Sequence, residues 1–282
     1  MDRKCPGTLP GPQGMRLAVT IAEEAKPLAP ILLRGPSGYT TSEAAAFGYL
    51  GVENHIPDIW NFNPDDLAVA CRNSGVVVSA LVSGQLNVRQ GLSITSDDES
   101  VVEKALEGLR LFVDAAKRLQ TGVVVGWVRG RVDGRDRKVF MNRQAAAMRV
   151  IDAYAAENGV PLYIEAINRY ELDTLVTADE IIGFIRENGL ASTYAHLDTF
   201  HMNIDEHSFE RAIRKCGPLL GYMHVAENTR HYPGHDRLDF DSAFRALRDI
   251  GYDGFVSVEC LPLPSGREAA KRAFEFLSYR YF

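Results

Sequence analysis

The stretch Pro161-Leu-Tyr-Ile-Glu165 is a short apolar run that ends on a carboxylate, and the same pattern occurs three more times along the chain. The other copies are Tyr194-Ala-His-Leu-Asp198, Leu220-Gly-Tyr-Met-His224 and Phe255-Val-Ser-Val-Glu259. Short apolar runs indicate buried strands, and each of these ends on a side chain that can bind a metal ion. Since a closed parallel barrel brings the carboxyl ends of its strands to one rim, the pattern predicts a barrel with a functional site there.

The rest of the chain, from Met15 onward, alternates between strand and helix signals. Runs rich in β-branched residues predict four earlier strands near residues 16–21, 51–55, 75–82 and 122–128. The segments between strands carry apolar residues at helical spacing, and glycines follow several of them as expected helix stops. Ser96 with Glu99 is a candidate capping box for one helix. This alternation predicts a single (β/α)8 TIM barrel as the catalytic domain, over residues 15–282.

An open doubly wound α/β sheet is the alternative fold. It would need a glycine-rich phosphate-binding turn after the first strand, whereas Ile21-Ala-Glu-Glu-Ala25 stands at that place. Residues 1–14 are rich in Gly and Pro and contain no apolar core segment. A flexible N-terminal extension is therefore expected there, in place of a signal peptide.

The composition argues against several kinds of partner. The formal net charge is -6 and no basic run stands out, so nucleic acid is not an expected partner. No apolar stretch approaches the roughly 18 residues of a transmembrane helix, so no membrane partner is expected. The four cysteines lie far apart and form no CxxC pair, which favours reduced thiols in a cytoplasmic protein.

Three carboxylates and one imidazole at a barrel rim form a ligand set for a hard or borderline divalent cation. Carboxylates this close would repel one another in a low-dielectric cavity unless positive charge neutralised them. A cluster of Arg or Lys side chains at the same place would be the alternative source of that charge. Bound Mn²⁺, Mg²⁺ or Co²⁺ is the simpler explanation, and its expected ligands are Glu165, Asp198, His224 and Glu259.

Longer motifs surround three of these residues. They read Ile164-Glu-Ala-Ile-Asn-Arg-Tyr-Glu171, Asp198-Thr-Phe-His-Met-Asn-Ile-Asp-Glu206, and His224-Val-Ala-Glu-Asn-Thr-Arg230 with Pro233-Gly234 after it. These segments closely resemble the ketose 3-epimerases, the family of D-tagatose and D-psicose 3-epimerases within the xylose isomerase-like superfamily of barrels. The resemblance covers the last four strands well and residues 1–140 only weakly.

The resemblance implies a metal-dependent enzyme of the isomerase class with a Mn²⁺-type site. It implies that Glu165 and Glu259 also act as acid–base residues, and that Glu171, His201 and Arg230 contact substrate oxygens. Epimerisation beside a ketone removes a proton from one face and returns it to the other, which two opposed carboxylates can do. A divalent ion chelating both substrate oxygens would stabilise the enediolate. Because aldose–ketose isomerisation uses the same enediolate, the sequence leaves epimerase and isomerase open.

The segment after the fourth strand adds a feature that the simple ketose 3-epimerases do not need. Epimerases of this group carry an aromatic residue there that walls the substrate, and Trp127 occupies the place, followed by Arg129 and Arg131. Arginines beside a barrel mouth favour a carboxylate or phosphate, so Trp127 and Arg129 are expected to bind substrate. The expected substrate is a ketose or its sugar-acid or sugar-phosphate derivative. A solvated basic loop is the alternative for the arginines.

Other functions stay open on the same scaffold. The main alternative is a metal-dependent lyase that abstracts a proton beside the ketone of a 3-keto glycoside and cleaves it by β-elimination. A hydrolase related to endonuclease IV would need more His ligands and a more basic face than seven histidines and a net acidic chain provide. A non-catalytic sugar-binding barrel would be indifferent to EDTA. The resemblance also implies a homo-oligomer, a dimer or tetramer.

Overall fold

The computed structural model describes residues 14–282. The flexible extension is expected over residues 1–14. Apart from Gly14, it lies outside the described residues. The strands that form the barrel are β1 (Arg16–Ala22), β3 (Gly51–His55), β4 (Val77–Val82), β5 (Val123–Val125), β6 (Leu162–Glu165), β7 (Thr193–Asp198), β8 (Leu220–Val225) and β9 (Phe255–Val258). A further strand, β2 (Leu33–Arg34), pairs only with the end of β1.

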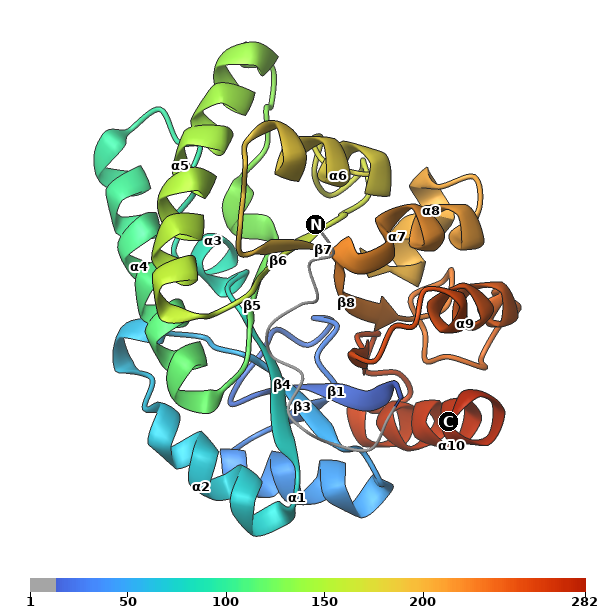
Figure 1. Cartoon of the computed structure of the whole chain (residues 1–282). Helices are drawn as coiled ribbons and strands as arrows, with labels where there is room; N and C mark the ends of the chain where they lie inside the picture. The colour runs from blue at the N-terminus through green and yellow to red at the C-terminus, as the bar shows by residue number, and fades with distance from the viewer. Residues whose placement is uncertain (1–13) are drawn as a thin grey trace.

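Every recorded strand pairing is parallel, and the sheet closes on itself. Each barrel strand pairs with the next along the chain, and β1 also pairs with β9 through Arg16 opposite Phe255. The intervening helices lie outside the ring of strands, as Figure 1 shows. Within residues 14–282 this is the predicted (β/α)8 barrel, with β2 as an addition that the sequence did not predict.

The helices begin and end at recognisable sequence signals. The long ones are α1 (Ser37–Phe47), α2 (Pro64–Ser74), α4 (Glu99–Leu119), α5 (Arg137–Asn158), α6 (Ala178–Glu187), α8 (Phe209–Cys216), α9 (Phe240–Asp249) and α10 (Gly266–Tyr281). Thr177, Ser208 and Ser265 cap α6, α8 and α10 with their side-chain oxygens, which satisfies a backbone N–H in each first turn. Gly159 ends α5 in the left-handed conformation, as expected.

The start of α4 differs from the sequence expectation. Asp98 is the residue before the helix, and its carboxylate accepts from the Ser100 backbone N–H at 2.9 Å. The hydroxyl of Ser96 instead accepts from the Asp98 N–H. The predicted capping box of Ser96 and Glu99 is therefore wrong by two residues, because an aspartate in the same polar run forms the cap.

Two apolar layers stabilise the barrel. The larger one packs the outward faces of the strands against the helices, with Val52, Leu81, Phe112 and Ile151 among its fully buried members. The smaller one fills the barrel interior and is rich in aromatic residues, including Tyr163, Tyr194, Tyr222 and Phe255. Strands buried on both faces explain the nearly continuous apolar runs in the sequence.

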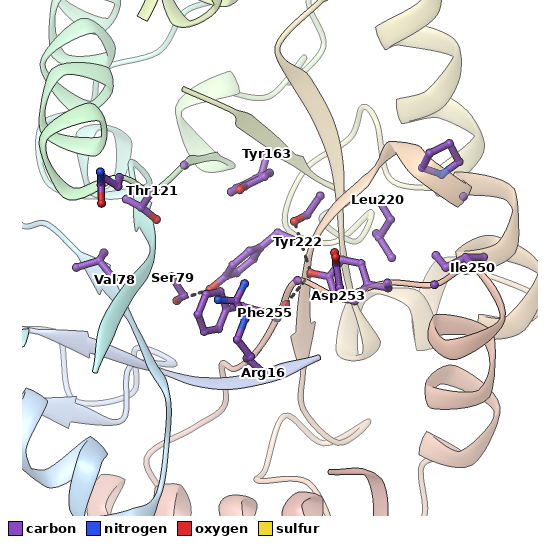
Figure 2. A pocket seen from close by; sticks show the side chains of 18 residues that line it. Arg16, Val78, Ser79, Thr121, Tyr163, Leu220, Tyr222, Ile250, Asp253 and Phe255 are labelled. Carbon is purple, nitrogen blue, oxygen red and sulfur yellow. Dashed lines mark hydrogen bonds between the residues drawn. The ribbon is translucent and has the colours of Figure 1, made fainter. Parts of the chain in front are cut away.

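Interior aromatic residues line a pocket of about 180 Å³ at the amino-terminal end of the barrel. Figure 2 shows Tyr163, Tyr222 and Phe255 there together with Arg16, and the Arg16 guanidinium stacks on the Phe255 ring at 4.1 Å. The Tyr222 hydroxyl and Ser79 Oγ share a hydrogen bond of 2.7 Å. The opposite, carboxyl-terminal end is covered by loops, the short helices α3 (Gln85–Val88) and α7 (Thr199–Asp205), and the 3-10 turn η2 (Trp127–Arg129). In residues 14–282 no helix is both long and apolar enough to cross a bilayer.

Candidate active site at the carboxyl-terminal rim

The four residues predicted to bind a metal meet at this rim. Glu165 and Asp198 are the last residues of β6 and β7, His224 is near the end of β8, and Glu259 directly follows β9. All four are buried, and one ligand atom from each lies within 4.8 Å of the others. His224 Nδ1 is 3.7 Å from both Glu165 Oε1 and Glu259 Oε2. The structure therefore brings together the cluster that the strand ends predicted.

Two atoms of this cluster are placed to bind a divalent cation. Asp198 Oδ1 accepts a hydrogen bond from the Phe200 N–H at 2.9 Å, which starts α7. Its other oxygen, Oδ2, is buried without a hydrogen-bond partner, and so is His224 Nδ1. Unpaired buried acceptors are costly, and a divalent ion would satisfy both at once. The donor set of three carboxylates and one imidazole suits such an ion chemically.

Glu53 on β3 orients the imidazole of His224 from behind. Both Glu53 oxygens lie close to His224 Nε2, at 2.8 and 3.0 Å. Since a carboxylate only accepts, Nε2 carries a proton, and Nδ1 is the ring nitrogen that can offer a lone pair to an ion once it loses its own proton. The Tyr222 hydroxyl also donates to Glu53 at 3.0 Å and is itself bonded to Ser79. Ser79, Tyr222, Glu53 and His224 thus form a polar column that runs from the amino-terminal end of the barrel to the rim.

The charges in this cluster shift several pKa values. Burial alone would raise the pKa of Glu53, but the His224 and His55 imidazoles lower it well below its usual range. Burial raises the pKa of Asp198 to about 7, and it also raises the pKa of Glu165. Burial opposes a charged His224, yet Glu53 and Glu259 raise its pKa well above the ordinary value. Glu165, Asp198 and His224 therefore hold protons more tightly than free side chains do, and a cation would compete with those protons.

The three predicted substrate contacts, Glu171, His201 and Arg230, lie next to the cluster. Arg230 donates to Glu259 Oε2 and to Glu171 Oε1, each at 3.0 Å. His201 Nε2 is 3.6 Å from Glu165 and 3.7 Å from Asp198. Asn168, which the sequence reasoning did not single out, donates to Glu171 and lies 2.7 Å from His201 Nδ1.

That contact sets the protonation of His201. An amide NH₂ can only donate, so His201 Nδ1 accepts from Asn168 and the ring proton sits on Nε2. Burial and the charge of Arg230 lower the pKa of His201 well below its usual value, so the ring is neutral. His201 therefore presents a neutral N–H donor toward the space between Glu165 and Asp198.

A pocket of about 390 Å³ opens above the cluster. Its polar floor includes Glu165, Glu171, His201, Arg230 and Glu259. Its outer part is mainly apolar and comes from the β1–β2 loop, the end of β4, α3 and η2; the residues are Lys26, Leu28, Ala29, Pro30, Ile31, Val82, Val88 and Trp127. Trp127 thus stands where the resemblance placed an aromatic wall.

Arg129 does not lie in this pocket, and its predicted role as a substrate ligand is not supported. Its side chain is completely buried and donates to the backbone carbonyls of Glu165 at 2.7 Å and Thr174 at 3.2 Å. Burial lowers the pKa of Arg129 to about 10. Arg131 donates to Asp133 and to the carbonyls of Tyr170 and Glu171. Both arginines therefore donate hydrogen bonds to backbone carbonyls that would otherwise have no donor.

Glu53 and His196 lie beside the cluster, although neither is the last residue of its strand. Glu53 lies mid-strand in β3, and a register shift follows Val52 at that point; a similar shift precedes His196 in β7. Such irregularities re-aim side chains and are common near active sites. His196 packs edge-on against His224, with ring centroids 4.1 Å apart, and burial lowers its pKa well below normal. His196 therefore packs in the barrel interior beside the cluster.

Comparisons with known proteins agree with the barrel fold. A model of the xylose isomerase-like TIM barrel family matches residues 42–280. The L-ribulose 3-epimerase of Methylomonas sp. strain DH-1 is 31% identical over 219 residues, covering 77% of this chain and 75% of that protein. The 3-dehydro-D-guloside 4-epimerase of Escherichia coli K12 is 36% identical over 128 residues, covering 45% of this chain and 47% of that protein.

One solved structure extends the comparison to nearly the whole chain. The crystal structure of a D-allulose 3-epimerase from Methylomonas sp. in complex with D-allulose superimposes with a TM-score of 0.80 and 25% identity. The match covers 96% of this chain and 98% of that one. These relatives confirm the expectation of an enzyme of the isomerase class that resembles the ketose 3-epimerases. The chain belongs to the xylose isomerase-like TIM barrel family.

Proposed function

We propose that this protein is a divalent-metal-dependent sugar epimerase that moves a proton at the carbon beside the ketone of a ketose. The observation that carries the proposal is the pair of unpartnered buried acceptors, Asp198 Oδ2 and His224 Nδ1, within a four-residue cluster spanning less than 4.8 Å. Glu165, Asp198, His224 and Glu259 would hold Mn²⁺, Mg²⁺ or Co²⁺. When bound, such an ion supplies Lewis-acid stabilisation of negative charge on the sugar oxygens.

Glu165 and Glu259 are the proposed acid–base pair. They come from β6 and β9, with two strands between them, so their carboxylates approach the pocket from different sides. One removes the proton from the carbon beside the ketone, and the other returns a proton to the opposite face. Arg230 fixes Glu259 by its 3.0 Å hydrogen bond, and Arg129 fixes the Glu165 backbone. The Nε2–H of His201 is placed to donate to a substrate oxygen.

The floor of the pocket favours a neutral sugar over an acid or a phosphate. The two arginines that suggested an anionic substrate are engaged with protein carbonyls. Arg230 is already shared between Glu171 and Glu259, which leaves Lys26 on the outer wall as the other cation lining the described pocket. Carboxylates and neutral donors suit the hydroxyl groups of a ketose.

Proton exchange with solvent tests this proposal directly. Protein stripped with EDTA and reloaded with Mn²⁺ would be incubated with ketoses in D₂O and followed by NMR. Deuterium should enter at the carbon beside the ketone only with metal present. Glu259→Gln should reduce the exchange rate by roughly 10²–10⁴-fold, the usual contribution of a general acid–base group. The exposed Glu275→Gln serves as the matched control.

Two results would contradict the proposal. Equal exchange in metal-free protein would remove the cation from the mechanism. Unchanged exchange in Glu259→Gln would remove the paired carboxylates. An active enzyme that labels only sugar acids or phosphates would instead overturn the assignment of a neutral substrate.

A lyase acting on 3-keto glycosides is the second candidate. The pocket continues past the polar floor to an apolar wall that includes Leu28, Val88 and Trp127, where an aglycone could lie. The same proton abstraction would then be followed by β-elimination of the leaving group. Release of free aglycone from a 3-keto glycoside would support the lyase, whereas formation of an epimeric glycoside would support the epimerase.

We also infer a cytoplasmic protein that assembles as a homo-oligomer. Cys71, Cys216 and Cys260 are unpaired and buried, which is consistent with a reducing compartment. Tyr279 and Phe282 at the carboxyl terminus are exposed, and such aromatic residues are frequent in protein interfaces. Light scattering of the purified protein would give the oligomeric state.

A further inference from the structure

The β8–α9 loop, between Val225 and Phe240, carries a second cluster of metal-competent side chains. His231, His235 and Asp236 each offer one ligand atom, and these atoms lie within 4.8 Å of one another. None of the three belongs to the rim cluster. His231 is half-buried, and the other two side chains are reached by solvent.

The backbone of this loop is held firmly from inside. Glu227 is buried, and its carboxylate accepts from the backbone N–H groups of Gly234 at 2.9 Å and Leu238 at 3.0 Å. The Glu227 N–H also donates to the carbonyl of His231. Tyr232, between the two histidines, is buried and bonds Arg272 through its hydroxyl at 2.9 Å. The backbone that presents His231 and His235 is therefore fixed without any ion.

The side chains already form a small polar network. The imidazole rings of His231 and His235 stack with centroids 4.3 Å apart. Thr229 Oγ1 lies 2.9 Å from His231 Nδ1 and also donates to Asp236. Asp236 Oδ1 lies 3.0 Å from His235 Nδ1. Partners of this kind orient imidazoles in metal sites.

We propose that His231, His235 and Asp236 bind a second divalent ion of the borderline class, such as Zn²⁺ or Ni²⁺. Two imidazoles and one carboxylate form a donor set that suits these ions and leaves one position for water. Ligands about 2.1 Å from a tetrahedral ion lie roughly 3.4 Å apart, so the rings must turn to close the site. Their exposure gives them room to do so while the backbone stays in place.

The two sites differ in chemistry, and this makes the inference testable. The rim cluster has three carboxylates and one imidazole, which favours a harder ion such as Mn²⁺. The loop site is nitrogen-rich and should discriminate against Mn²⁺ in favour of Zn²⁺. The inference does not depend on the proposed function, since it concerns ion binding alone.

Equilibrium dialysis against Zn²⁺, with metal analysis of the protein, tests the loop site. Wild-type protein should retain one Zn²⁺ more per chain than the double variant His231→Ala/His235→Ala. The exposed His207→Ala serves as the matched control and should retain as much as wild type. Thermal unfolding would verify that each variant is folded.

Loading the rim first separates the two sites. Protein preloaded with Mn²⁺ should take up one equivalent of Zn²⁺ without releasing its Mn²⁺, and the double variant should not. Uptake that is equal in wild type and the double variant would overturn the inference. Stoichiometric release of Mn²⁺ with each Zn²⁺ bound would do the same, because the ion would then occupy the rim.

Discussion

Glu53 is a residue whose importance emerges only in three dimensions. In the sequence it is one charged residue within a short strand, and its partner His224 lies 171 residues later. The structure shows it buried, with two oxygens on one imidazole edge and the Tyr222 hydroxyl on one of them. A carboxylate in this position makes the opposite ring nitrogen a better ligand.

Glu53→Gln should weaken Mn²⁺ binding by about 10–100-fold, the usual effect of losing such a partner. Glutamine can keep one hydrogen bond to His224 but lacks the charge that favours a basic Nδ1. Isothermal titration with Mn²⁺ would measure the change, and the exposed Glu103→Gln would be its control. Wild-type affinity in Glu53→Gln would show that the carboxylate does not act through His224.

The residues that sequence reasoning placed well share one property. Glu165, Asp198, His224 and Glu259 each end an apolar run, and strand ends converge by the geometry of a barrel. Arg129 lies in a loop, whose path no periodicity describes, so its burial against the Glu165 carbonyl could not be anticipated. Asn168 was missed for the same reason, although it lies inside a quoted motif.

At the scale of elements, two glycines show opposite constraints. Gly221 lies in β8 in the barrel interior, where an added Cβ would come within 2.6 Å of Tyr194 and 2.8 Å of Tyr163. Gly183 lies within α6, where the nearest atom to such a Cβ is Glu187 Oε1 at 4.0 Å. The same substitution should therefore change stability in opposite directions.

Gly221→Ala should lower the free energy of unfolding by about 1–3 kcal/mol, the usual cost of overpacking a core. Gly183→Ala should raise it by about 0.5–1 kcal/mol, since alanine is the better helix former. Urea denaturation of the two variants would measure both changes. A destabilised Gly183→Ala would contradict the expectation that this side of α6 has room for a methyl group.

The elements that the sequence did not predict are short and sit at the rim. β2 has two residues and exists only because the β1–β2 loop returns along β1. α7 begins directly at Asp198, which ends β7 and caps the helix at the same time. Because no loop separates β7 from α7, the sequence has no turn residues there that would indicate a new helix. The long helices, in contrast, are marked by capping residues and by glycines at their ends.

For the whole molecule, metal ions and protons should compete for the same side chains of the rim cluster. Burial raises the pKa of Asp198 to about 7, from about 3.9 in an unfolded chain. Between these values the folded, metal-free protein holds a proton that the unfolded chain has lost, so stability falls as pH rises through this window. The raised pKa of His224 means that its proton must also leave before an ion binds.

The stabilisation by Mn²⁺ should therefore be larger at pH 8 than at pH 5. At 100 times the dissociation constant a ligand adds about 2.7 kcal/mol, and at pH 5 the ion must first displace protons from Asp198 and His224. Thermal unfolding with Mn²⁺ and with EDTA at both pH values would measure the difference. Asp198→Asn should reduce the dependence on pH; an equal shift at pH 5 and pH 8 in the wild type would contradict the assignment.

The polar column inside the barrel limits how such enzymes can be recombined. Its members come from both halves of the chain, with Glu53 and Ser79 in the first and Tyr222 and His224 in the second. A chimera that joins the leading half of one relative to the trailing half of another would separate these partners. Exchange of segments between homologues should succeed only when all four residues come from the same parent. This holds even though Ser79 and Tyr222 lie toward the amino-terminal end of the barrel, away from the proposed metal ligands.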